Sequence, residues 1–140
     1  MYPVQQLVGT LLYYANTVDP TMLVALDTLS SQQSKTTKPT YYTIMWLLNY
    51  AYSNPNATIW YTTSYMILYI HSDASYLSAP LARIFAGGYY FLSNRSHNLT
   101  KPPRTRLRIN GPIHTVSKIM SNVMGSAAEA EIGATYINGQ

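Results

Sequence analysis

The residues with the clearest chemical potential are two acids, Asp73 and Glu131. Asp73 directly follows an apolar run at 66–71 that is typical of a strand, and Glu131 lies on a predicted helix that comes after two further predicted strands. This order suits a pair of carboxylates at one edge of a sheet. Carboxylates that leave coordination positions open favour Mg²⁺, and two such ions can stabilise the attacking and leaving oxygens of phosphodiester cleavage. The pattern therefore predicts a divalent-metal site.

Each acid also has a plainer interpretation. Aspartate at the end of a strand often bonds a nearby backbone amide in a turn. Glu129 competes with Glu131, because residues two apart on a helix point about 200° from each other and only one can face Asp73. Ser126 and Glu129 fit a capping box, in which the glutamate reaches back to the serine amide. We therefore favour Glu131 for the metal and Glu129 for the cap.

Three helices and then four strands are expected to position these acids. Apolar residues recur at helical spacing from Val4 to Ala15 and predict the first helix. Asp19-Pro20 starts a second helix, on which Asp27 is expected to be solvated. A third helix is predicted from Pro39 to Asn54-Pro55. β-Branched and aromatic runs predict strands at 58–63, 66–71, 87–92 and 112–117, with a turn at 64–65 between the first two and a last helix after Ser126. The predicted class is α+β (or α/β), with an antiparallel start to the sheet.

The composition excludes several classes of protein. The chain has 140 residues, 47% of them hydrophobic and 10% charged, and no cysteine, which argues against intrinsic disorder and against a disulfide scaffold. No apolar run reaches the roughly 18 residues of a membrane helix, and no signal peptide opens the chain. We expect an intracellular protein that is not secreted and does not enter a membrane.

The basic residues are concentrated in a loop predicted at 94–110. Arg104, Arg106 and Arg108 alternate there, so in an extended conformation they would project to one side and could meet successive phosphates of a nucleic acid. The other interpretation is a solvated loop, which Pro102-Pro103 also suits. The sequence favours neither.

Four segments in order resemble the ribonuclease H region of copia-type retrotransposon polyproteins, a part of the reverse transcriptase family. Residues 71–76 are similar to the strand that bears the first catalytic aspartate, and 86–91 to the strand after it. Residues 126–131 resemble the serine-rich start of the helix with the catalytic glutamate, and 7–14 with Asp19-Pro20 resemble the segment joining polymerase to ribonuclease H. The resemblance implies that Asp73 and Glu131 are catalytic and bind Mg²⁺.

The resemblance also implies two parts, a helical connector at 1–56 and a partial ribonuclease H-like domain at 57–140 with a mixed sheet and one helix. The parent domain would hydrolyse the RNA strand of RNA·DNA hybrids with a divalent metal during reverse transcription. The later carboxylates of the family have no counterpart after Glu131. We therefore expect a C-terminally truncated fragment that is inactive alone.

A non-enzymatic nucleic-acid-binding protein, or a decayed remnant of the element, is the alternative. The expected partners are an RNA·DNA hybrid or another nucleic acid and the remainder of the polyprotein. A second copy could also pair through an unpaired sheet edge.

Overall fold

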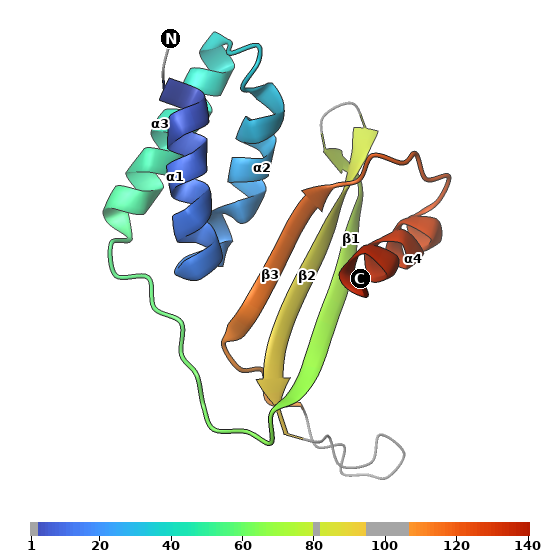
Figure 1. The fold of residues 1–140 in the computed structure, drawn as a ribbon. Coiled ribbons are helices and arrows are strands. Elements are labelled where there is room, and N and C mark those ends of the chain that lie inside the picture. The colour runs from blue at the N-terminus through green and yellow to red at the C-terminus, as the bar shows by residue number, and fades with distance from the viewer. Residues whose placement is uncertain (1–2, 80–81, 95–106) are drawn as a thin grey trace.

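The computed structural model describes residues 3–79, 82–94 and 107–140 (Figure 1). Its elements in chain order are α1 (Pro3–Thr17), the 3-10 turn η1 (Pro20–Met22), α2 (Leu23–Gln32), α3 (Lys38–Ser53), β1 (Ile67–Ala79), β2 (Arg83–Ser93), β3 (Pro112–Ile119) and α4 (Ala127–Asn138). Helices and a three-stranded antiparallel sheet make an α+β fold, which confirms the predicted class. Within the described residues, no helix combines the length and the apolar character needed to cross a membrane.

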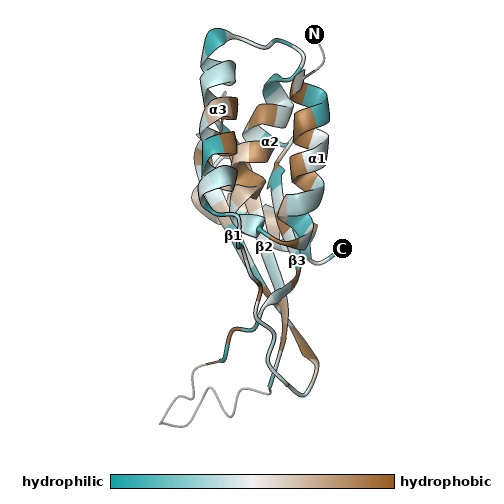
Figure 2. Ribbon diagram, turned by 90° about the vertical axis from the view of Figure 1, so that its left-hand side faces the viewer, coloured by the Kyte–Doolittle hydropathy of each residue, from teal (hydrophilic) through white to brown (hydrophobic). Residues whose placement is uncertain are grey.

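The first three helices form a bundle, here called the helical unit. Side chains cap η1, which leads into α2, and α3: the Asp19 side chain accepts the Thr21 amide at 3.2 Å, and Thr37 and Thr40 cap each other reciprocally. Apolar residues at helical spacing meet in its core, and Figure 2 shows brown apolar turns on each helix. The buried members are Val4, Val8, Ala15, Met22, Leu23, Leu26, Leu29, Ile44 and Leu47. The helices predicted from periodicity are confirmed.

The sheet has the order β1-β2-β3 and carries helices on both sides (Figure 1). Ala130 and Ala134 of α4 pack with Ile84 and Ala86 on one side, called the α4 face. The helical unit lies against the other side, called the α2 face, because α2 contacts β3 there. Side chains on a strand alternate between the two faces, so the register decides which residues each helix meets.

The sequence prediction of a strand at 58–63, joined to 66–71 by a turn, is wrong. Residues 54–66 have no strand structure, and β1 begins only at Ile67. Residues 54–66, which join the helical unit to the sheet, are here called the connector, a different segment from the helical part predicted at 1–56. The backbone of the connector bonds elsewhere: the Thr62 amide donates to Asn110 Oδ1 at 2.8 Å, and the Gly111 amide donates to the Trp60 carbonyl at 3.0 Å. These bonds satisfy the polar groups that a strand ladder would otherwise use.

β1 also continues further than the sequence predicts, to Ala79. Asp73 therefore lies inside the strand, opposite Gly87, and not after its end. The weak strand preference of Ser72, Asp73 and Ser75 is overridden by pairing with β2, which is continuous from Ile67 to Ser75.

The start of α4 is capped by Ser126, as predicted. The Ser126 hydroxyl oxygen accepts the Glu129 amide at 3.1 Å. The second half of the predicted capping box is wrong by one residue, because the Glu129 carboxylate accepts the amide of Gly125 at 2.7 Å and not that of Ser126. Glu129 thus has the capping role that we expected, on a different donor.

Candidate functional site

The structure places Asp73 and Glu131 apart. Asn138 of α4 donates to the Ser72 hydroxyl at 2.8 Å, and Ala74 packs against the cluster that contains Ala130 and Ala134. Ser72 and Ala74 are the two neighbours of Asp73 on β1, so strand alternation directs Asp73 to the α2 face. Glu131 is exposed on α4, on the other side of the sheet.

This arrangement does not fit a Mg²⁺ ion shared by the two carboxylates, because the sheet lies between them. The described residues contain no group of three or more His, Cys, Asp or Glu side chains able to hold a metal ion. Glu129 lies on α4 as well and is occupied by its bond to Gly125. Neither Glu129 nor Glu131 therefore joins Asp73 in a shared metal site.

Asp73 faces a groove of about 510 Å³ between the sheet and α2. Its floor comes from β1 and β2, with His71 beside Asp73 on the same face, and its wall includes Leu23 and Val24 of the helical unit. The His71 ring packs edge-on against Phe91 with 5.1 Å between ring centroids. The groove is mainly apolar, and Asp73 is its one carboxylate among the described lining residues.

A second acid, Asp27, was expected to be solvated and is half-buried. Its carboxylate accepts the Ser117 hydroxyl of β3 at 2.8 Å, which ties α2 to the sheet. Burial raises the pKa of Asp27, and the hydrogen bond from Ser117 acts in the opposite direction. No pattern in the sequence indicated this contact, because the two residues are 90 positions apart.

The predicted nucleic-acid-binding arginines are described only in part. Arg104 and Arg106 lie outside the described residues. Arg108 is exposed, and its backbone carbonyl accepts the Ser93 hydroxyl at 2.6 Å, so its main chain is held at the end of β2. The alternation of the three arginines stays a prediction.

Asn110 bonds several chain segments together at one end of the sheet. Nothing in the sequence signalled this role. Its side chain is buried and makes hydrogen bonds to Thr62 in both directions, with a further donation to the Leu92 carbonyl at 2.9 Å. The Tyr89 hydroxyl donates to its backbone carbonyl at 2.9 Å. Asn110 thereby joins the connector, β2 and the segment before β3.

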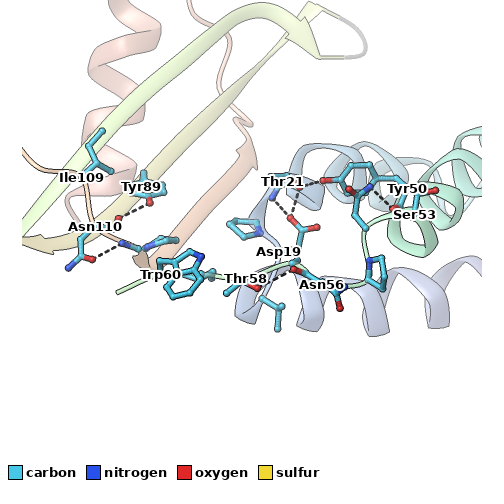
Figure 3. Close-up of a pocket in the computed structure, with 18 residues that line it drawn as sticks. Asp19, Thr21, Tyr50, Ser53, Asn56, Thr58, Trp60, Tyr89, Ile109 and Asn110 are labelled. Carbon is cyan, nitrogen blue, oxygen red and sulfur yellow. Dashed lines mark hydrogen bonds between the residues drawn. The ribbon is translucent and has the colours of Figure 1, made fainter. Parts of the chain in front are cut away.

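A cavity of about 710 Å³ opens beside Asn110, between the helical unit, the connector and the sheet (Figure 3). Asp19 and Thr21 line it from the helical unit, Trp60 from the connector and Tyr89 from β2. Asp19 is 5% exposed and is engaged with Thr21. Tyr50 of α3 also lines the helical end, so polar and aromatic side chains are mixed along the cavity.

Comparison of the chain with protein-family models, curated proteins and solved structures gave no match. The resemblance to copia-type ribonuclease H regions therefore rests on the four sequence segments alone.

Proposed function

We propose that this chain is part of a copia-type ribonuclease H-like region that binds RNA·DNA hybrids and does not cleave them by itself. Beside the four sequence segments, the order of elements agrees with this proposal, since three consecutive antiparallel strands precede a helix that packs on their sheet. Asp73 lies on the first strand and the serine-capped start of α4 carries Glu131. The parent domain would hydrolyse the RNA strand with a divalent metal.

The observation that carries the absence of cleavage is the position of Asp73 on the α2 face and Glu131 on α4. Two-metal phosphodiester cleavage needs carboxylates that converge on one pair of ions. A groove with one carboxylate does not supply that arrangement. Hybrid binding is instead supported by charge, because five of the nine basic residues fall between 95 and 108.

Binding is tested by fluorescence anisotropy of a labelled RNA·DNA hybrid over a range of salt concentrations. The variant R104Q/R106Q/R108Q should bind more weakly, and the slope of log affinity against log salt should fall by roughly 2 to 3. K35Q/K38Q/K118Q is the matched control, because it removes three exposed positive charges from other parts of the chain. Equal effects of the two variants would refute a specific role for the loop.

Cleavage is tested on the same hybrid with an end-labelled RNA strand and added Mg²⁺ or Mn²⁺. We expect no cleavage by the chain, and the same result for Asp73→Asn. Cleavage by the wild-type chain that disappears in the Asp73→Asn variant would contradict this part of the proposal.

A further inference from the structure

We infer that exposed aromatic residues of the connector form a stacking surface for an unpaired nucleic-acid strand, separate from the groove at Asp73. This inference deepens the proposed function and rests on it in part. The residues concerned are Trp60, Tyr61 and Tyr65 of the connector, and they are here called the connector surface. Ile109 lines the same cavity as Trp60, and Arg108 precedes Ile109 in the chain.

The aromatic side chains of the connector surface face solvent although the backbone beneath them is held. Trp60 and Tyr65 are both 80% exposed, and Tyr61 is 58% exposed. The Trp60 carbonyl accepts the Gly111 amide, and the Tyr65 amide donates to Asn94 Oδ1 at 2.9 Å. Large aromatic rings on an anchored backbone lose little conformational freedom when a base stacks on them.

Close packing keeps the connector in this position. A Cβ atom at Gly111 would lie 2.6 Å from the Trp60 carbonyl oxygen and 2.7 Å from Ile59 Cγ2, so only glycine allows the approach. The Tyr61 hydroxyl donates to the Pro112 carbonyl at 2.8 Å. The rings are therefore presented by a defined backbone.

The positive charge that follows Asn94 in the sequence fits a polyanion. The Tyr65 amide donates to Asn94, the Ser93 hydroxyl donates to the backbone carbonyl of the exposed Arg108, and four more basic residues and no acid occur in the sequence between Asn94 and Arg108. Between Asp27 and Asp73 the sequence contains no acid at all. Asp19 lines the neighbouring cavity, but it is buried and bonded to Thr21.

Aromatic rings beside positive charge are the combination with which proteins bind single strands without reading their sequence. A base-paired hybrid has its bases stacked inside the duplex, so its bases cannot stack on Trp60 or Tyr65. An unpaired strand has free base faces. The five residue-to-residue steps from Trp60 to Tyr65 cover at most about 17 Å, which suits a short stretch of nucleotides.

The two tryptophans of the chain make a matched pair for the test. Trp46 on α3 is 78% exposed, nearly the same as Trp60, but lies in the helical unit. With excitation selective for tryptophan over the 14 tyrosines, the Trp46→Phe variant reports on Trp60 alone and the Trp60→Phe variant on Trp46 alone. Titration with a dT oligonucleotide of about 12 nucleotides, within the site sizes known for single-strand binders, should quench the first variant saturably and leave the second unchanged.

Affinity provides the second readout. Trp60→Ala and Tyr65→Ala should each weaken binding of the oligonucleotide roughly 5- to 150-fold, the range for losing one stacked base. Tyr13→Ala, which removes a 76% exposed ring from α1, should leave binding unchanged. Circular dichroism confirms that each variant is folded. Equal quenching of the two tryptophans, or unchanged affinity of Trp60→Ala, would overturn the inference.

Parallel titration with a blunt RNA·DNA hybrid separates this inference from the proposed function. Hybrid binding without quenching of Trp60 by the oligonucleotide would refute the connector surface alone. Oligonucleotide binding that depends on Trp60, without hybrid binding, would refute the proposed function alone. Binding of neither would refute both, and binding of both, with only the oligonucleotide dependent on Trp60, would support both.

Discussion

Replacing Asn110 by alanine should lower the free energy of unfolding by more than the loss of one hydrogen bond, because its side chain makes several. The Asn110 side-chain amide bonds both Thr62 of the connector and Leu92 of β2. Its oxygen accepts the amides of Thr62 at 2.8 Å and Gly111 at 3.0 Å, and its nitrogen donates to the carbonyls of Thr62 at 2.8 Å and Leu92 at 2.9 Å. The residue is 8% exposed, so water does not freely replace these bonds.

The magnitude follows from the groups left without a partner. The Gly111 amide keeps a second acceptor, the Trp60 carbonyl, and the exposed Thr62 hydroxyl, which donates to Asn110 Oδ1 at 3.3 Å, can bond water instead. The two bonds to the Thr62 backbone and the one to the Leu92 carbonyl therefore decide the cost. At about 0.5 to 1.5 kcal/mol for each, the free energy of unfolding should fall by about 3 kcal/mol. Asn110→Asp should cost more at neutral pH, because a carboxylate would face the Thr62 and Leu92 carbonyls.

Urea denaturation followed by circular dichroism measures the loss, and hydrogen exchange of the Thr62 amide measures local release of the connector. Asn122→Ala is the control, since Asn122 is exposed and only accepts a 3.3 Å bond from Ser121; its effect should stay within about 0.5 kcal/mol. A loss of less than about 1 kcal/mol for Asn110→Ala, or retained protection of Thr62, would refute the role assigned to Asn110.

Two further predictions concern the packing of helices on the sheet. Gly88→Ala should lower the free energy of unfolding by about 1 to 3 kcal/mol in the same urea assay, because a Cβ there would lie 2.9 Å from Asn138 Cγ. Gly87→Ala is the control: its Cβ would meet only the Asp73 carbonyl at 3.8 Å, so it should be neutral or slightly stabilising. Because the pKa of Asp27 is raised in the folded state, its contribution to stability is complete below its usual pKa and is lost as pH rises through the raised pKa. The melting temperature should therefore fall with rising pH through this range, and Asp27→Asn should remove that contribution from thermal unfolding measured between about pH 3 and pH 6. An unchanged pH dependence of the melting temperature in Asp27→Asn would contradict the assignment.

The helices were predictable because their signals are local. The apolar spacing acts over about ten residues, and the Asp19 cap followed by Pro20 and the Ser126 cap each act over a single turn. All of them reappear in the structure. The strands at 87–92 and 112–117 were also found, within β2 and β3. The strand expected at 58–63 failed because a residue 48 positions away, Asn110, takes the backbone bonds of Thr62.

The sequence by itself determined the helices, the strands that lie within β2 and β3, and the concentration of positive charge between 95 and 108. The tertiary structure alone decided which way Asp73 points. Because side chains alternate strictly along a strand, the packing of Ser72 and Ala74 against α4 sends Asp73 to the opposite face, away from Glu131. The burial of Asp27 and the exposure of Trp60 were also decided by tertiary structure. Asp27 meets Ser117 of β3, and the Trp60 backbone meets Gly111, only when the chain folds.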